Sequence, residues 1–352
     1  MAYRFPAEWS PHAATWIAWP HHEPDWPGKL APIPWVYAEI VRVLHRHERV
    51  EILCHDEDVR EAARRHLAAH GVRENFNLHV VPNDRVWVRD SGPTFVLGDD
   101  GRTSLMNWRF NAWAKYSNFE RDVQVGAAVE RITGLPRIEP VRPDTGERVV
   151  LEGGAIDVNG TGTLLATEEC LLDGKKQVRN PGLSREALEN VLGAYLGVRK
   201  VLWLGRGIAG DDTHGHVDDL ARFVDETTVV IAQQSDPDDV NYEPLRENRA
   251  RLESMTTADG RPLRVLSLPM PEPLSLDGIR LPASYANFYI GNEAVIVPTF
   301  NDPNDRAALQ MLAGLFPTRR VVGIHAVDLV WGFGTLHCMT QQQPAAVTTS
   351  GK

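Results

Sequence analysis

The sequence predicts a mixed α/β fold made of five similar units that close into a ring. Two observations support this prediction. An order of polar cluster, strand, tight turn, strand and helix recurs along the chain. The clusters lie at Asp90, Glu152, His216, Asn287 and Cys338, at intervals of 62, 64, 71 and 51 residues. Units of this size are too small to bury an apolar face alone, so such a repeat indicates units that pack on their neighbours.

Strands and helices also precede the first unit. The periodicity of apolar residues predicts a strand at 9–19, a helix at 34–47, a strand at 50–54, a helix at 58–70 and a strand at 78–81. The fifth unit begins at Cys338 and ends after a few residues. We therefore expect the N-terminal strand and helix to complete it and to close the ring, so that all five clusters point to one central pocket.

Four strand pairs are predicted within the units, because their turns contain Gly, Asn or Asp, which supply the dihedral angles of tight turns. The pairs are 94–97 with 103–108, 156–158 with 164–166, 221–224 with 229–232, and 288–290 with 295–299.

Two of the helices that follow are marked by their ends. Ser184 is a predicted N-cap, and Gly197 closes the same helix. A second helix opens at Asp302-Pro303 and stops at Pro317. The helices are followed by predicted strands at 200–204 and 320–324.

The composition is that of a globular protein with a sizeable core. The chain has 352 residues, of which 43% are apolar and 24% are charged. No linker rich in Pro, Gly or Ser divides it, so we expect one catalytic domain over residues 1–343. The small, polar residues 344–352 predict a flexible C-terminal tail.

Charge and cysteine content narrow the class of partner. A net charge of −10 makes nucleic acid an unsuitable partner and suits a cationic small molecule. The chain has three cysteines, an odd number, and they are widely spaced. This favours neither a disulfide framework nor a zinc site. The N-terminus has no apolar signal region, and no stretch approaches the roughly 18 apolar residues of a membrane helix. We therefore expect a cytoplasmic protein without a membrane partner, and a homo-oligomer is compatible with the sequence.

The candidate nucleophile is Cys338, which lies in the glycine-rich and polar segment 332–342. Glycines let a backbone approach a ligand closely. The alternative is a structural cysteine at a strand end, because a free cysteine packs as a small hydrophobic residue. The repeated polar clusters favour the nucleophile, since together they would bring a thiol, an imidazole, several carboxylates and aromatic rings to one pocket.

These groups suit a guanidinium substrate. A thiolate is a strong nucleophile, and a neighbouring histidine can activate it or carry its proton. Paired carboxylates match the fork of N–H donors on a guanidinium group. They would also raise the pKa of the thiol, so the thiolate would be held best once the cationic substrate has arrived. The pattern predicts attack of sulfur on a guanidinium carbon.

Other interpretations stay open at this point. Asp90 could form a structural ion pair with Arg89, and Glu152 could cap a turn. The pattern His-x-His-x-Asp at residues 214–218 resembles a metal-ligand spacing and would indicate a metal-dependent amidohydrolase. A non-catalytic binding protein on the same scaffold is a further alternative.

Short motifs occur in a fixed order along most of the chain. They are the segments 5–9, 15–20, 87–94, 110–113, 152–154, 167–171, 215–218, 284–289 and 337–342. Together these motifs resemble the agmatine deiminase family, also called the bacterial-type peptidylarginine deiminase family, within the guanidino-group-modifying (pentein) superfamily. The resemblance implies a five-fold pseudosymmetric α/β propeller of ββαβ-type units, the pentein fold.

The resemblance also implies a mechanism. Cys338 would be the nucleophile that forms an amidino-cysteine intermediate and releases ammonia, and His216 would be the general acid and base. Asp90 and Asp218 would bind the guanidinium nitrogens, and Glu152 would orient His216. No metal and no organic cofactor is implied. The implied reaction converts agmatine and water to N-carbamoylputrescine and ammonia, a step of putrescine biosynthesis.

The chain departs from the family near the substrate tail. The plant and streptococcal members carry Asn at the position of His214, glycines and Asn around Phe333 and Thr335, and glycines at 114–116. Deiminase chemistry is therefore better supported than agmatine as the substrate, and free or peptidyl arginine or another guanidino compound is the alternative. The residues that would bind the rest of the substrate are Trp87, Trp113, Asp211, Asp212 and Asn287.

Two further expectations concern single side chains. Glu152 and Asp218 should raise the pKa of His216, because nearby negative charge favours the imidazolium. Cys54 and Cys170 should be inert to alkylation relative to Cys338.

Overall fold

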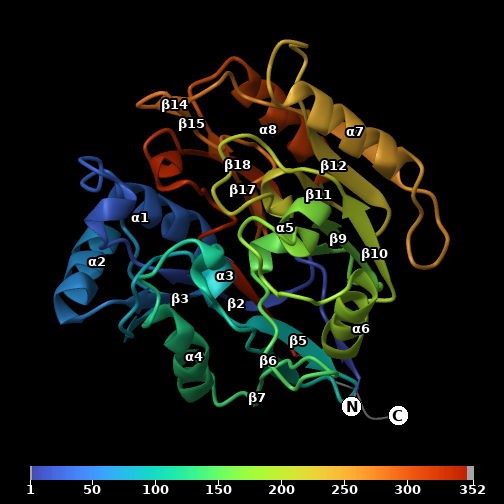
Figure 1. Cartoon of the computed structure of the whole chain (residues 1–352). Coiled ribbons are helices and arrows are strands. Elements are labelled where there is room, and N and C mark those ends of the chain that lie inside the picture. Colours follow the sequence, from blue (N-terminus) through green and yellow to red (C-terminus); the bar gives the residue numbers. More distant parts are fainter. Residues whose placement is uncertain (1, 347–352) are drawn as a thin grey trace.

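The structure, a computed structural model, describes residues 2–346 of the chain. Its strands form five sheets of three or four strands and one small hairpin. In Figure 1 the longer helices lie toward the outside of the molecule, and the short helices α3 and α5 lie nearer its middle.

Four sheets share one topology, in which an antiparallel pair is followed by a helix and by a strand parallel to the second strand. Their strands are β5 (Thr94–Gly98), β6 (Thr103–Met106) and β7 (Arg137–Ile138); β8 (Asp157–Val158), β9 (Thr163–Thr167) and β10 (Lys200–Leu204); β11 (Ala221–Phe223), β12 (Thr228–Gln233) and β13 (Arg264–Pro269); β16 (Tyr289–Ile290), β17 (Ala294–Thr299) and β18 (Arg320–His325). The helices before their third strands are α4 (Val125–Thr133), α6 (Arg185–Leu196), α7 (Tyr242–Glu253) and α8 (Asn304–Leu315). The four predicted hairpins are confirmed.

The fifth sheet joins the two ends of the chain. Its order is β19 (Gln341–Pro344), β2 (His12–Ala18), β3 (Arg49–Cys54) and β4 (Phe76–Val80), with helices α1 (Ile33–Leu44) and α2 (Glu57–Ala69) in the connections. Strand β19 pairs antiparallel with β2, with Gln341 opposite Trp16. The expectation that the N-terminal segment completes the last unit is confirmed.

The remaining elements are short. They are β1 (Tyr3–Arg4), α3 (Val88–Ser91), α5 (Glu168–Leu172), the hairpin of β14 (Ser275–Leu276) and β15 (Ile279–Arg280), and single 3-10 turns at Glu23–Asp25, Ala112–Ala114, Asp122–Gln124, Gly153–Ala155, Val217–Asp219 and Leu329–Gly332.

Local chemistry explains where the well-predicted helices begin and end. The hydroxyl of Ser184 accepts a hydrogen bond from the backbone N–H of Ala187, and Gly197 ends α6 in the left-handed region at φ 70°. Helix α8 begins at Asn304, just after Pro303. The sequence interpretation missed α4, α7 and β13. Helix α7 is highly charged and buries only a narrow stripe that includes Leu245 and Leu252, so its apolar signal is weak.

The fold places each polar cluster immediately before the first strand of a sheet. Asp90 lies in α3 ahead of β5, Glu152 ahead of β8, His216 ahead of β11, Asn287 ahead of β16 and Cys338 ahead of β19. The same topological position in five sheets therefore supplies the candidate site residues.

The C-terminal segment begins inside the last sheet. Pro344 is the final residue of β19, and the backbone N–H of Ala345 donates to the carbonyl of Pro11. The rest of the predicted tail, residues 347–352, lies outside the described residues. Over residues 2–346, no helix has the length and apolar character needed to cross a membrane.

Candidate active site

Cys338 lies at the inner end of a pocket of about 690 Å³ that is partly open to solvent. Its side chain is 8% exposed and follows the 3-10 turn Leu329–Gly332. The pocket is lined by aromatic rings and carboxylates that come from distant parts of the chain. The lining includes Trp87, Asp90, Trp113, Tyr116, Asp212 and Trp331.

Asn287 fixes the loop that carries the thiol. Its amide nitrogen donates to Sγ of Cys338 at 3.1 Å, and its amide oxygen accepts from the Thr335 hydroxyl at 2.7 Å. The same oxygen accepts from the backbone N–H of His337 at 2.9 Å. Asn287 is fully buried and lies outside the pocket lining, so the structure places it beneath the nucleophile loop rather than along the substrate tail.

The two aspartates predicted to bind a guanidinium lie close to one another and to the thiol. Oδ2 of Asp218 is 3.6 Å from Sγ of Cys338. Asp90 accepts from the backbone N–H of Gly154 and from the indole N–H of Trp113, both at 2.9 Å. Oδ1 of Asp218 is buried and has no hydrogen-bond partner. An unpaired carboxylate oxygen beside a cavity is a ready acceptor for a cationic ligand.

His216 faces both aspartates. Its Nδ1 lies 3.8 Å from Oδ2 of Asp90 and 4.0 Å from Oδ1 of Asp218. Its Nε2 lies 4.0 Å from Oε2 of Glu152. The other oxygen of Glu152 accepts from Arg179 Nε at 2.9 Å, and both side chains of that pair are fully buried. Glu152 is therefore held in place by Arg179 on the Nε2 side of His216.

Burial and charge shift the pKa values of this group. Burial raises the pKa of the Cys338 thiol well above its usual value, and the nearby charges of Asp218, Asp219 and Asp90 raise it further. Burial also raises the pKa of Asp90 to about 6, against the lowering influence of His216. These shifts reflect the burial of the site and the carboxylates that surround the thiol.

The pKa of His216 moves in the predicted direction. Burial alone would lower it, but Asp90 raises it well above its usual value, with smaller contributions from Cys170 and then from Asp218. The predicted direction is confirmed, and Asp90 rather than Glu152 is the leading partner. His216 is therefore an imidazolium, able to donate a proton, at neutral pH.

Two glycines leave the space that this arrangement needs. A Cβ on Gly154 would lie 2.6 Å from Nδ1 of His216 and 3.0 Å from oxygens of both Asp90 and Asp218. A Cβ on Gly334 would lie 2.8 Å from the Trp87 ring. Such distances are not tolerated by real Cβ atoms, so side chains at these positions would displace the catalytic groups or close the pocket.

The Trp113 segment has an unusual backbone. Ala112, Trp113 and Ala114 all have positive φ values, of 51°, 58° and 51°. Residues other than glycine adopt this region at a cost, and the surrounding structure must hold them there. The turn directs the Trp113 indole at Asp90, so the wall of the pocket and the Asp90 carboxylate are linked directly.

The open end of the pocket carries paired charges. Asp212 forms an ion pair of 3.2 Å with Lys115 and accepts a hydrogen bond from the Tyr116 hydroxyl. Asp25 pairs with Arg85 at 2.6 Å, and both residues line the pocket. A cationic substrate tail that binds Asp212 must therefore compete with a cation of the protein itself.

Asp211 serves the loop rather than the pocket lining. Its carboxylate accepts from the backbone N–H groups of Thr213, Gly215 and His216 at 2.7–2.8 Å. It thereby fixes the backbone that presents the His216 imidazole.

The three residues of the predicted metal-ligand pattern, His214, His216 and Asp218, do not all lie together in the structure. His214 lies 2.8 Å from Asp173 through Nε2 and 3.7 Å from Glu169 through Nδ1. Among the described residues, the groups whose geometry could hold a metal ion are Glu152 with Cys170 and His216, and Asp218 with Asp219 and Cys338. His214 belongs to neither group, so His214, His216 and Asp218 do not form one ligand set.

Comparison with known proteins assigns the chain to a family. The family model for Porphyromonas-type peptidyl-arginine deiminase matches residues 4–344. The chain belongs to this family. An agmatine deiminase of Stutzerimonas stutzeri is 38% identical over 97% of this chain and 96% of its own length.

Solved structures extend the relationship to the fold. The agmatine deiminase of Enterococcus faecalis, described as catalysing its reaction, matches with a TM-score of 0.90 and 34% identity over 98% of this chain and 97% of its own. A cysteine-to-serine variant of the C. jejuni agmatine deiminase, solved with substrate bound, matches with a TM-score of 0.86 and 28% identity over 98% of this chain and 97% of its own. This member of the Porphyromonas-type peptidyl-arginine deiminase family therefore has the mixed α/β fold of the agmatine deiminases.

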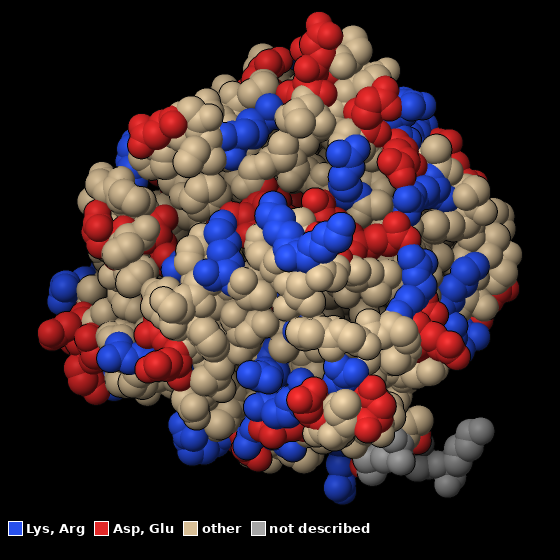
Figure 2. Space-filling view, in the orientation of Figure 1, with Lys and Arg blue, Asp and Glu red and all other residues tan. Residues whose placement is uncertain are grey.

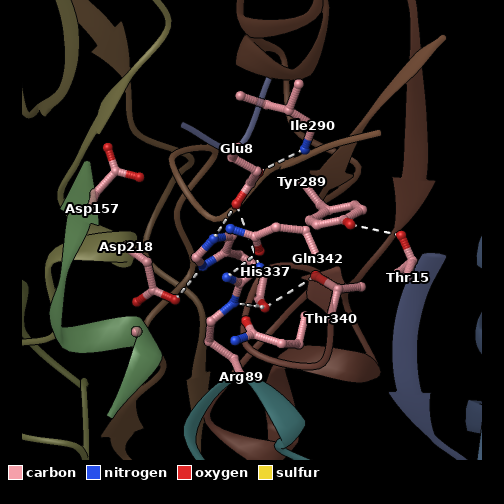
Figure 3. A network of polar contacts seen from close by, with 12 residues as sticks. Glu8, Thr15, Arg89, Asp157, Asp218, Tyr289, Ile290, His337, Thr340 and Gln342 are labelled. Atoms are coloured by element: carbon pink, nitrogen blue, oxygen red, sulfur yellow. Dashed lines mark hydrogen bonds and ion pairs between the residues drawn. The ribbon is translucent and has the colours of Figure 1, made fainter. Parts of the chain in front are cut away.

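Two polar residues beside the thiol received no role from sequence reasoning. Glu8 and His337 lie in a buried network that reaches Asp218 (Figure 3). His337 precedes the nucleophile, and this adjacency was the available signal. Glu8 is 329 positions away in the sequence, and no local pattern points to it.

Proposed function

We propose that this chain is a cysteine-dependent deiminase that hydrolyses agmatine to N-carbamoylputrescine and ammonia. The supporting observation is the arrangement around the Cys338 thiol: Asp90 lines the same pocket, the Asp218 carboxylate lies 3.6 Å from the sulfur, and the His216 imidazole lies 3.8 Å from Asp90. Membership of the family and the full-length similarity to agmatine deiminases support the same reaction and substrate.

Substrate binding prepares the nucleophile in this proposal. Asp90 and Asp218 accept hydrogen bonds from the guanidinium nitrogens, whose charge offsets the carboxylates that raise the pKa of Cys338. The thiol then loses its proton more readily, and the thiolate faces the guanidinium carbon. Trp87 and Trp113 line the same pocket and would pack against the substrate.

The chemical steps balance through His216. The thiolate adds to the guanidinium carbon, and the His216 imidazolium protonates one nitrogen, which leaves as ammonia. The carbon remains bound to sulfur as an amidino-cysteine. Neutral His216 then removes a proton from a water molecule, whose oxygen adds to the carbon. The C–S bond breaks to give the urea product and the thiolate, and the remaining hydroxyl proton, like the thiol proton lost before the attack, passes to solvent. Glu152, held by Arg179, would orient His216.

Substrate choice depends on the far end of the pocket. Asp212 is the candidate partner for the primary ammonium of agmatine, provided that Lys115 yields its place. Free or peptidyl arginine is the second candidate, because Arg85 and Lys115 lie at the same end and would suit a carboxylate. Near the middle of the face in Figure 2, acidic side chains gather beside basic ones, so charge alone favours neither tail strongly.

A substrate panel tests the function. We expect the purified protein to release ammonia from agmatine with a higher kcat/KM than from arginine or an arginyl peptide, and Cys338→Ala to abolish release while the protein stays folded. Turnover retained by Cys338→Ala would overturn the nucleophile assignment. Activity that survives iodoacetamide but is lost with a chelator would favour the metal-dependent amidohydrolase, and ligand binding without turnover would favour a binding protein.

The arrangement of the chain is part of the proposal. We infer a five-fold pseudosymmetric α/β propeller over one catalytic domain, residues 1–343, because five sheets repeat the ββαβ order and each sends a polar cluster from the same position. A cytoplasmic location and a homo-oligomeric state remain predictions, to be checked by fractionation and by light scattering.

A further inference from the structure

The residue before the nucleophile joins the site to a buried charge network. Nδ1 of His337 lies 2.7 Å from Oδ2 of Asp218, and its Nε2 lies 2.7 Å from Oε2 of Glu8. The histidine is 1% exposed and Asp218 is fully buried. Figure 3 shows the imidazole between the two carboxylates, with Arg89 below it.

This geometry determines what each ring nitrogen does. Carboxylate oxygens accept hydrogen bonds, so both ring nitrogens must donate unless a carboxyl holds a proton. Both carboxyl groups favour the ionised form. Burial would raise the pKa of Glu8 and of Asp218, but Arg222 and His337 hold the pKa of Glu8 below its usual value, and the hydrogen bond from His337 does the same for Asp218. The geometry therefore places each ring nitrogen of His337 to donate to one carboxylate.

The outer carboxylate is itself fixed from several sides. Oε1 of Glu8 accepts from the backbone N–H of Ile290 at 2.8 Å and pairs with Arg222 at 3.0 Å. Arg222 also pairs with Asp157 at 2.9 Å. Glu8 thus gives the imidazole a rigid partner on the side away from the pocket.

The inner carboxylate, Asp218, contacts the protein through one oxygen and leaves the other without a partner. Oδ2 of Asp218 accepts from His337, while Oδ1 is buried without a partner and lies 4.0 Å from Nδ1 of His216. A carboxylate with one oxygen anchored can rotate little, so its free oxygen keeps one direction. The anchored Oδ2 is the oxygen that lies 3.6 Å from Sγ of Cys338 and would lie 3.0 Å from a Cβ on Gly154, so the contact with His337 fixes the carboxylate beside the space where the guanidinium would lie.

We propose that His337 is a positioning residue for the deimination: it anchors the Asp218 carboxylate against Glu8, so that this carboxylate meets the substrate's guanidinium in one orientation. The inference rests on the proposed function, because it assigns His337 to the binding of that substrate. It adds Glu8, from the N-terminus, to the support of the site.

Two substitutions separate the two hydrogen bonds of His337. The amide nitrogen of asparagine lies near the place of Nδ1, and that of glutamine near the place of Nε2. His337→Asn should keep a donor for Asp218 and lose the contact with Glu8, whereas His337→Gln should do the reverse. Both remove the imidazole ring, so each serves as a control for the other.

We expect His337→Gln to raise KM for agmatine strongly and to lower kcat/KM by about 100-fold, with kcat less affected, because a charge-assisted hydrogen bond to the binding carboxylate is lost. His337→Asn should lose about 10-fold, with a thermal midpoint close to that of His337→Gln. Equal activity in the two variants, or higher activity in His337→Gln, would overturn the proposal. His79→Asn, which removes a 2.7 Å contact with Glu51 outside the pocket lining, should leave KM unchanged.

A second measurement does not depend on turnover. In protein with ¹⁵N-labelled histidine, the His337 signals can be assigned by their loss in His337→Asn. We expect both ring nitrogens of His337 to carry protons at neutral pH; a neutral tautomer would overturn the proposal. If the wild-type protein releases no ammonia from any guanidino compound, the proposed function fails by itself, and the NMR result still decides the protonation on which the anchor depends.

Discussion

The indole N–H of Trp113 donates a 2.9 Å hydrogen bond to Oδ2 of Asp90, one of the two carboxylates proposed to bind a guanidinium. Three consecutive residues with positive φ hold the indole in this position. Trp113 therefore both walls the pocket and orients the carboxylate, and these two effects can be separated by substitution.

Trp113→Phe should keep the wall and remove the donor. We expect kcat/KM for agmatine to fall about 10-fold, because one hydrogen bond to a charged acceptor is lost. Steady-state kinetics measure the effect. The matched control is Trp108→Phe, which removes a buried 3.2 Å indole bond to Thr94 outside the pocket lining and should leave kcat/KM unchanged. A similar loss in both variants would indicate a general packing effect.

Asp90→Asn should lose activity, and its stability relative to the wild type should increase as the pH rises. Burial raises the pKa of Asp90 to about 6 in the folded protein, against about 3.9 in an unfolded chain. The folded state therefore binds the proton more tightly, and the stability linked to Asp90 is fully present below pH 3.9 and is lost as the pH rises through 6. Asparagine does not ionise, so Asp90→Asn does not lose this stability as the pH rises.

The difference in the free energy of unfolding, Asp90→Asn minus wild type, should thus increase by at most about 3 kcal/mol as the pH rises from 4 to 8. Denaturant titrations at several pH values measure this difference. Agmatine turnover should fall sharply, because the guanidinium loses a charged acceptor. A difference that stays constant with pH would show that Asp90 titrates normally.

Gly154→Ala should inactivate the site while the fold persists. The added Cβ would stand 2.6 Å from Nδ1 of His216 and 3.0 Å from both aspartates, so these groups must move apart. Displacements near 1 Å can cost about 100-fold in rate, and we expect a loss of at least that size. Gly174→Ala is the control, because its Cβ would meet nothing within 4 Å. Equal kinetics in the two variants would place the reacting carbon elsewhere.

The ion pair between Lys115 and Asp212 in the pocket predicts an effect of Lys115 on the KM for agmatine. Lys115 occupies the Asp212 carboxylate, so Lys115→Met should free it for the ammonium of agmatine and lower KM by about 2- to 5-fold, the range of an exposed ion pair. The KM of butylguanidine, which lacks the tail charge, should not change. Lys175→Met, at an exposed position, is the control. A higher KM for agmatine in Lys115→Met would show that Lys115 assists binding, as a carboxylate-bearing substrate would require.

The sequence revealed those parts of the site that depend on residue type and repeat. Cys338, Asp90, His216 and Glu152 occur at one topological position in successive units, and the local pattern alone finds them there. Residues that act through tertiary contacts were not accessible in this way. Glu8 meets His337 across 329 positions, and Asn287 resembles a pocket residue until its contacts with the Cys338 loop are known.

The sequence pattern did not predict those elements of the fold that bury few apolar side chains. Helix α7 was missed because its buried stripe includes Asn248 and a proline among few apolar residues, and β7 spans only Arg137–Ile138. By contrast, the hairpins were found because turn chemistry is local. The closing pair of β19 with β2 followed from counting units rather than from any feature of the strands themselves.

The three thiols should differ in reactivity in a way that depends on the charge of the reagent. Cys54 is fully buried and burial raises its pKa to about 12, while Cys170 is 1% exposed beside His216. Cys338 reaches the pocket, but burial and its aspartate neighbours raise its pKa well above the usual value. A neutral reagent should therefore alkylate even Cys338 slowly at pH 7, since the thiolate is the reactive form.

A cationic reagent should behave differently. Chloroacetamidine carries an amidinium that can occupy the place of the guanidinium between Asp90 and Asp218, offset their charge and favour the thiolate. We expect it to label Cys338 at least about 10-fold faster than chloroacetamide does, after correction for the intrinsic reactivity of the two reagents toward a free thiol. Peptide mass spectrometry locates the label, and Asp218→Asn should remove most of the advantage. Equal corrected rates, or labelling of Cys54 or Cys170 at the rate of Cys338, would mean that the carboxylates do not control this thiol.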